Sequence, residues 1–486
     1  MVFSSTVFLF LYLPVVLGVY FLTPRKLKNL LLLTASLFFY AWGEGFFVGV
    51  MLASILVNYL VATQINRFRT TPKGKAFLLV AIIANLGLLI LFKYANFLVE
   101  NLNSLLAGLG FAPITMNPIH LPIGISFFTF QALSYVIDVY KGSAKAQANP
   151  IHVALYISLF PQLIAGPIVR YHDVARQITA RTHSIAQFSE GVQRFIFGLA
   201  KKVLIANPLG LVADQIFAIP LEQVNAGLIW LGVLCYSLQI YFDFSGYSDM
   251  AIGLGRMIGF RFLENFNYPY ISQSLQEFWR RWHISLSNWF RDYLYIPLGG
   301  NRCVAWRVYF NLVTVFFLCG LWHGASWNFV VWGLLHGLFL IFERLGLAKT
   351  LALFPRIVRH AYVLLFLMIS WVFFRADNLS SAMLYLAAMI GEGTGDGLIY
   401  HVGLYLNREV AFVLIIGVIG STPIIPYLRQ LHVRGIMRRK AAYSAPYAFI
   451  HYAMPIAYPA LLAAMLLVSV TYMASGTYNP FIYFRF

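Results

Sequence analysis

Long apolar runs recur along the whole chain and restrict its fold more than any other feature. Runs of about 18 or more residues can cross the hydrocarbon of a bilayer as helices. A soluble protein could not bury this much apolar surface, because 60% of the 486 residues are hydrophobic and only 11% are charged. The sequence therefore predicts an all-α, multi-pass membrane protein that forms one membrane domain over residues 1–486, with about ten to twelve spans.

Basic residues gather in short loops between the apolar runs, which predicts the sidedness of the chain. Arg25–Lys28 and Arg67–Lys75 should both be cytosolic, because basic loops stay inside and two spans, Leu30–Trp42 and Phe46–Ala62, separate them. Asn101–His120 contains no Lys or Arg and should be an outer loop.

The net charge of +18 is consistent with the same rule. It favours a membrane with anionic lipid, and a basic cytosolic entrance for a phosphorylated substrate, over nucleic acid as a partner. The loop Arg429–Lys440 carries five basic residues and is also predicted to be cytosolic.

Two apolar segments contain residues that break helices. Pro122 and Gly124 predict a helix start beside irregular backbone. Phe160–Tyr171 (FPQLIAGPIVRY) contains two prolines and a glycine, and predicts a re-entrant or broken helix, with a proline-kinked span as the alternative. Irregular backbone at membrane depth must be surrounded by protein or line a water-filled cavity.

A few charged residues border apolar sequence and are assigned structural roles. The pair Lys201–Lys202 is predicted to mark an inner membrane edge. Asp243 and Asp249 are expected to pair with Arg256 or Arg261, or to cap helix N-termini.

The stretch Phe278–Gly337 contains three histidines in or beside apolar sequence: His283, His323 and His336. A titratable group in hydrocarbon costs about 2–4 kcal/mol unless it is paired or faces a cavity, so each is a candidate functional residue. His323 is the strongest, because a neutral imidazole in an apolar site can take a proton from a hydroxyl or thiol. A hydrogen-bonded structural histidine is the alternative. His336 lies thirteen residues further on, too far for a metal pair, and is assigned a structural role. No metal site is predicted.

Arg280 and Arg281 adjoin two tryptophans in FWRRWHISLS. Such a cluster is typical of a lipid-anchored inner interface. It would equally suit binding of the phosphates of a cytosolic acyl donor, since arginine presents a fork of donors. Trp322 and Trp327 are predicted to provide apolar walls near His323, on the donor-binding side of the site.

Several motifs in order resemble the membrane-bound O-acyltransferase family, in its bacterial polysaccharide-modifying branch: FKYANF, LPIGISFFTF, FPQLIAGP, YFDFSGYSDMAIGLG, FWRRWHISLS, RDYLYIPLGGNR and GLWHG. The resemblance implies a helical membrane fold with a central funnel or tunnel and a catalytic core at about residues 121–345. It places the family's catalytic histidine on His323 in WHG, and a second active-site position on His283 in RRWHIS.

The resemblance also implies a function. Acetyl would pass from a cytosolic donor, with acetyl-CoA as the donor substrate and no bound cofactor, through the bacterial inner membrane. Periplasmic partner proteins would complete O-acetylation of an exopolysaccharide such as alginate. The alternatives are D-alanyl or other acyl transfer to a cell-envelope polymer, and a non-enzymatic subunit for polymer export or anchoring.

Overall fold

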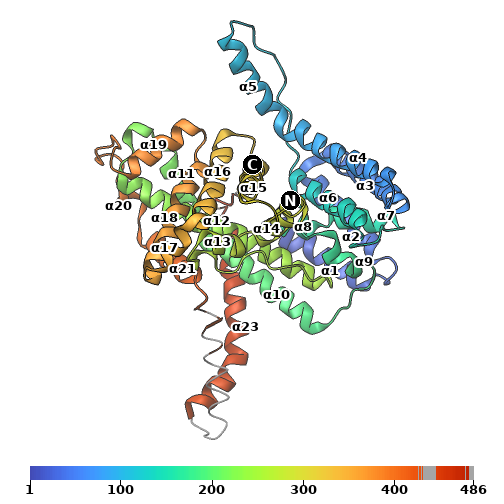
Figure 1. The fold of residues 1–486 in the computed structure, drawn as a ribbon. Coiled ribbons are helices and arrows are strands. Elements are labelled where there is room, and N and C mark those ends of the chain that lie inside the picture. Colours follow the sequence, from blue (N-terminus) through green and yellow to red (C-terminus); the bar gives the residue numbers. More distant parts are fainter. Residues whose placement is uncertain (425, 428–429, 431–444, 477, 481–486) are drawn as a thin grey trace.

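The computed structural model describes residues 1–424, 426–427, 430, 445–476 and 478–480, and over these residues the only regular secondary structure is helical (Figure 1). The predicted cytosolic loop Arg429–Lys440 lies almost wholly outside the described residues. In chain order the helical elements are η1 (Phe8–Tyr12), α1 (Leu13–Leu22), α2 (Lys28–Glu44), η2 (Gly45–Phe47), α3 (Val48–Phe68), α4 (Pro72–Leu89), η3 (Ile90–Tyr94), α5 (Ala95–Gly108), α6 (Ile125–Lys141), α7 (Pro150–Ser158), α8 (Phe160–Leu163), α9 (Tyr171–Thr179), α10 (Ile185–Ala200), η4 (Lys201–Ala206), α11 (Asn207–Phe217), η5 (Leu221–Gln223), α12 (Ala226–Met257), η6 (Pro269–Ile271), α13 (Leu275–Arg281), α14 (Ile284–Phe290), η7 (Arg291–Tyr295), α15 (Ala305–His323), α16 (Trp327–Phe342), η8 (Glu343–Leu347), α17 (Ala348–Ala352), α18 (Arg356–Arg375), α19 (Leu379–Met389), α20 (Val402–Tyr405), α21 (Arg408–Gly420) and α23 (Ala445–Ala474).

The structure confirms the all-helical, multi-pass membrane class. Among the described residues, eight helical segments are long and apolar enough to cross a membrane. This is fewer than the predicted ten to twelve, for two reasons. The segment Lys28–Phe68 counts once but contains two helices, α2 and α3, which Gly45 separates with a φ of 54° and which correspond to the predicted spans Leu30–Trp42 and Phe46–Ala62. Other apolar helices, such as α6 with 17 residues and α21 with 13, are short for a full crossing.

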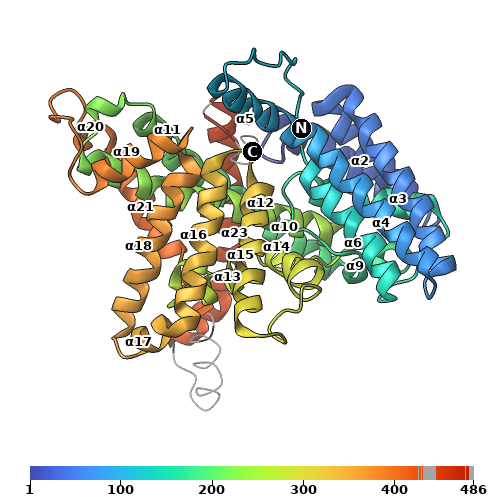
Figure 2. The same cartoon turned by 45° about the horizontal axis from the view of Figure 1, so that its top comes forward.

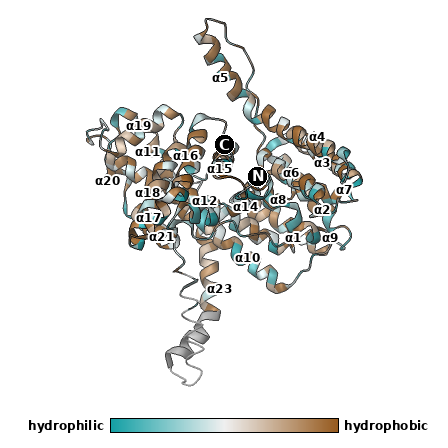
Figure 3. Ribbon diagram, in the orientation of Figure 1, coloured by the Kyte–Doolittle hydropathy of each residue, from teal (hydrophilic) through white to brown (hydrophobic). Residues whose placement is uncertain are grey.

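Helix α12 runs through the centre of the molecule, with α2–α4 and α6–α9 on one side and α16–α21 on the other (Figures 1 and 2). Its partner α10 packs unusually close, because glycines face backbone at the contact. A Cβ on Gly253 would lie 2.6 Å from the Gly191 carbonyl oxygen, and one on Gly246 would lie 2.7 Å from that of Gly198. The glycine-rich segment of α12 therefore serves close helix packing. The ribbons of α3 and α4, at the periphery, are largely brown and hence apolar (Figure 3), and apolar side chains such as Leu56 and Leu79 are exposed on them, as expected for helices that face lipid.

Asp243 and Asp249 form ion pairs, but with partners other than those predicted, and the membrane edge predicted at Lys201–Lys202 is wrong. The pair Lys201–Lys202 lies inside one continuous helical segment, Ile185–Phe217, and does not mark its edge. Lys202 is buried and forms an ion pair with Asp243 at 2.7 Å, and Asp249 pairs with Lys201 and Arg194. These partners come from the neighbouring helical segment α10–η4, which packs along α12. Arg256 and Arg261 are nearer in sequence but, within the part of the chain that the structure describes, do not pair with the two aspartates, because helix packing decides which charges meet.

The predicted breaks in two apolar segments are confirmed. Helix α6 begins at Ile125, directly after Gly124, whose φ of 75° is in the left-handed region. A Cβ at Gly124 would lie 2.8 Å from the Leu163 carbonyl oxygen, so only glycine fits this contact. Helix α7 stops at Ser158, α8 covers only four residues, and the backbone then continues without helix to Arg170. These irregular residues are buried in protein, as the membrane environment requires.

Candidate active site

The site is built on the hairpin of α15 and α16. Two glycines allow these helices to touch, since a Cβ on Gly320 would lie 2.2 Å from the Phe329 carbonyl oxygen and one on Gly333 would lie 2.2 Å from that of Phe316. Helix α15 ends at His323, and Gly324 then adopts an extended conformation. The close packing therefore fixes the end of α15, where His323 lies.

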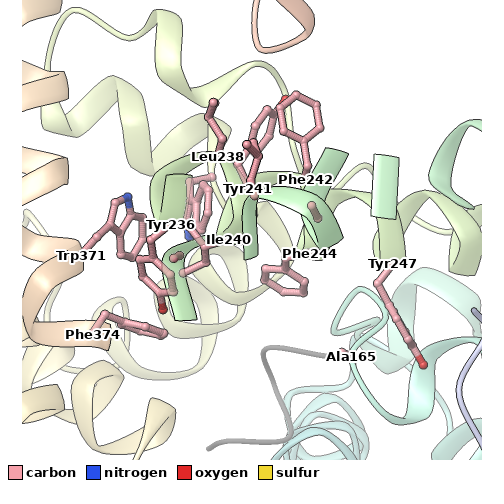
Figure 4. Close-up of a cluster of buried hydrophobic side chains, with 14 of the residues drawn as sticks. Ala165, Tyr236, Leu238, Ile240, Tyr241, Phe242, Phe244, Tyr247, Trp371 and Phe374 are labelled. Carbon is pink, nitrogen blue, oxygen red and sulfur yellow. The ribbon is translucent and has the colours of Figure 1, made fainter. Parts of the chain in front are cut away.

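His323 is buried, with 4% of its surface exposed, and aromatic rings surround its imidazole. The ring centroids of Trp322, Trp332 and Phe374 lie 4.9, 5.0 and 5.2 Å from that of His323. Phe374 belongs to the aromatic cluster between α12 and α18, where it lies near Trp371 (Figure 4). Walls of this kind exclude water, and an imidazole in such a place is suited to proton transfer.

His283 is fully buried and its ring also lies near Trp322, with ring centroids 6.0 Å apart. Its backbone has a φ of 42°, a conformation that residues other than glycine seldom adopt and that is concentrated at functional sites. Phe244 of α12, which is labelled in Figure 4, packs edge-on against the His283 ring with centroids 4.6 Å apart. The fold therefore brings both candidate histidines into contact with the same tryptophan, Trp322.

Asn265 orients His283, and the sequence analysis did not identify it. The backbone N–H of Ser285 donates to Asn265 Oδ1 at 3.1 Å, which fixes that atom as the amide oxygen. His283 Nδ1 lies 3.2 Å from the same oxygen, so Nδ1 must carry the proton. A neutral His283 then has Nε2 as an acceptor, and this atom has no hydrogen-bond partner among the described residues. The imidazole is therefore set to accept a proton or a hydrogen bond through Nε2.

A cavity of about 320 Å³ begins where α15 ends. It is lined by the turn Gly324–Ser326, by Phe374 next to His323, and by polar side chains that include Asp214, Gln239 and Arg375. Trp327 follows this turn and donates its indole N–H to Asn101 of α5 at 2.8 Å. Because α5 leads into the predicted outer loop, the cavity lies at the end of α15 nearer the predicted outer face.

Lys93 is a second residue of the site that sequence reasoning missed. It is 8% exposed and lines the cavity. Its ammonium donates to the carbonyl oxygens of Trp322 and His323 at 2.5 and 3.3 Å. The available signal was a single lysine within a long apolar run, in the motif FKYANF.

The other predicted residues fall into three places. Trp322 packs against both histidines, as described above. Trp327 is 54% exposed and lies against α5, away from the His323 ring. Arg280 and Arg281 end α13: Arg280 is exposed, whereas Arg281 forms an ion pair with Glu277 at 2.9 Å. Of the two arginines, Arg280 is thus the more available for an anionic ligand.

His336 is fully buried on α16 and accepts a hydrogen bond from Trp279 Nε1 at 3.2 Å. The bond joins α13, which carries the arginines, to the helix that packs on α15. This contact fits the structural role assigned to it from the sequence.

Known proteins resemble this chain over most of its length. The model of the MBOAT, membrane-bound O-acyltransferase, family matches residues 143–385. A probable alginate O-acetylase AlgI of Azotobacter vinelandii is 44% identical over 100% of both chains. One of Pseudomonas putida is 49% identical over 81% of both chains, and a peptidoglycan O-acetyltransferase of Helicobacter pylori is 38% identical over 80% of both.

Proposed function

The chain belongs to the membrane-bound O-acyltransferase family, and from this we propose that it supplies acetyl for O-acetylation of an exopolysaccharide such as alginate. It is a multi-pass membrane O-acetyltransferase. Relatives named for alginate match at 44–49% identity, and the relative named for peptidoglycan matches at 38%, which favours alginate as the polymer.

We propose that His323 is the catalytic base. One observation carries this assignment: His323 is buried at the end of α15, directly beside the 320 Å³ cavity. His323 takes the proton of an acceptor hydroxyl, whose oxygen attacks the thioester carbonyl of the acyl donor. The carbon–sulfur bond breaks, the thiolate leaves, and the proton passes to the sulfur. His283, whose ring lies near the same tryptophan, orients the reacting groups through Nε2.

Acetyl-CoA is the proposed donor, entering from the cytosol. Arg280 is exposed on α13 and offers a guanidinium to its phosphates. The cavity at the C-terminal end of α15 then receives the acceptor from the outer side. We propose the bacterial inner membrane as its location, because the donor would come from the cytosol and the acceptor from the opposite side. Periplasmic partner proteins of a polysaccharide-modification complex would complete transfer to the polymer.

The test uses purified protein in liposomes supplied with labelled acetyl-CoA, and compares wild type with His323→Ala. Loss of the catalytic base should lower acetyl transfer by about 10²- to 10⁴-fold. His401→Ala, in an exposed residue before α20, is the matched control and should keep wild-type turnover. Full turnover in a folded His323→Ala variant would remove His323 from the mechanism. If wild type did not turn over acetyl-CoA, the proposal that acetyl-CoA is the donor would be rejected.

A further inference from the structure

Two consecutive side chains from a distant segment hold the last turn of α15. The last carbonyl groups of a helix have no partner within it. Here Tyr94 donates its hydroxyl to the Leu321 carbonyl oxygen at 2.8 Å. Lys93 donates to the next two carbonyls, those of Trp322 and His323. Three successive carbonyls, ending at the candidate base, are therefore bound by one dipeptide.

Lys93 reaches this position from η3, a single π-helical segment between α4 and α5. Isolated π-helical turns are concentrated at functional sites. The third donor of the ammonium bonds Ser126 Oγ, at the start of α6, at 3.3 Å. A lysine has three donors, and all three are thus engaged by the protein. The positive charge also complements the negative end of the α15 dipole.

We propose that Lys93 and Tyr94 are positioning residues that fix His323 for proton transfer, an inference that rests on the proposed function of His323. The two side chains clamp the end of α15 against the opposite half of the molecule. Lys93 also lines the cavity, so the clamp sets the position of His323 relative to the space beside it. Because the ammonium has no donor left over, Lys93 acts through His323 and does not bind substrate phosphate.

The clamp should affect turnover far more than donor binding. A misplacement of about 1 Å at a catalytic group can lower a rate about 100-fold. Lys93→Met should therefore lower kcat by about 10- to 100-fold while the KM for acetyl-CoA stays within about twofold. The kcat of Lys93→Gln should lie between those of wild type and Lys93→Met, since an amide keeps two donors but carries no charge. Tyr94→Phe removes only a hydroxyl and should lower kcat by about three- to tenfold.

The chain offers a matched control for each substitution. Lys28 also donates to a carbonyl in the last turn of a helix, that of Tyr20 in α1 at 2.7 Å. Tyr12 also donates its buried hydroxyl to a carbonyl, that of Ala35 at 2.9 Å. Lys28→Met and Tyr12→Phe remove the same groups elsewhere, and kcat should stay within about twofold of wild type.

The deciding measurement is a double-mutant cycle with His323→Ala in the same liposome assay. If Lys93 acts through His323, adding Lys93→Met to His323→Ala should cause no further loss of activity. Additive losses, a KM increase that accounts for the whole effect, or an equal loss in Lys28→Met would overturn the proposal. Wild-type kcat in Lys93→Gln and Tyr94→Phe would do the same, even if Lys93→Met does not fold. Full activity in His323→Ala alone would instead reject the proposed function of His323.

Discussion

At the residue scale, the hydrogen bonds of one asparagine decide what His283 can do. Asn265 Oδ1 accepts from the Ser285 backbone, the Ser285 hydroxyl and His283 Nδ1, while Asn265 Nδ2 donates to Ser248 of α12. The amide therefore connects α12 to the turn that carries His283. It also fixes which imidazole nitrogen is the acceptor, and only the folded structure shows this.

We predict that Asn265→Leu lowers acetyl transfer by about tenfold or more, because the second histidine loses its orientation. The unfolding free energy should fall by about 1–3 kcal/mol, since the substitution leaves buried donors unsatisfied. Asn85→Leu is the control, because Asn85 of α4 forms a comparable pair of buried amide hydrogen bonds with Asn58 of α3. The two variants should lose similar stability, measured by thermal unfolding in detergent. If they also lost similar activity, Asn265 would have no specific role in the site.

At the element scale, one carboxylate joins three helical elements beside the predicted cytosolic surface. Asp138 of α6 accepts from His172 of α9 at 2.9 Å and from the Tyr293 hydroxyl of η7 at 2.8 Å. His172 lies outside the membrane-spanning segments. The hydrogen bond to Asp138 raises the pKa of His172 above its ordinary value of 6.5, and partial burial opposes the rise.

This contact predicts a pH dependence of stability. The folded protein holds the His172 proton more tightly than the unfolded chain, so the stabilisation is complete below pH 6.5 and is lost as the pH rises through the higher pKa of the folded state. Wild type should therefore lose more thermal stability between about pH 6 and about pH 8.5 than His172→Gln does. The measurement is the Tm of both proteins at each pH, with His401→Gln as control. Equal pH dependence in wild type and His172→Gln would contradict the prediction.

At the scale of the whole molecule, a buried ion pair connects the two central helical segments. Lys202 and Asp243 are 3% and 1% exposed and lie 2.7 Å apart. Lys202 also donates to the Pro480 carbonyl, and Asn479 next to it bonds Ser4 near the other end of the chain. One lysine thus links the α10–α11 segment, α12 and a residue close to the C-terminal end of the sequence.

Removing one partner of this pair should destabilise the entire fold. Lys202→Met is predicted to cost about 3–5 kcal/mol, because it leaves Asp243 buried without its cation. The double variant Lys202→Met/Asp243→Leu should recover most of that loss, since a well-packed apolar pair can replace a buried ion pair. Chemical unfolding in detergent measures both. A double variant as unstable as Lys202→Met would contradict the prediction, because the loss would then not come from the buried charge of Asp243.

Much of this protein could be predicted from its sequence. Apolar runs longer than a bilayer needs determine the membrane class, since no other fold can bury them. The motifs determine the family, and single titratable residues in hydrocarbon pointed to His283 and His323. Gly124, Pro161 and Gly166 likewise predicted the irregular backbone, because their local conformational preferences do not depend on partners.

The tertiary structure alone decided which distant residues meet. Lys93, Asn265 and the partners of Asp243 and Asp249 could not be assigned, because each contact joins segments far apart in the chain. Helix packing sets such contacts, and the period of the apolar pattern shows which face is buried but not which helix it meets. The sequence alone thus determined that the chain is a membrane acyltransferase with a buried histidine. Packing at glycine contacts, which lets helices touch, decided how that histidine is held.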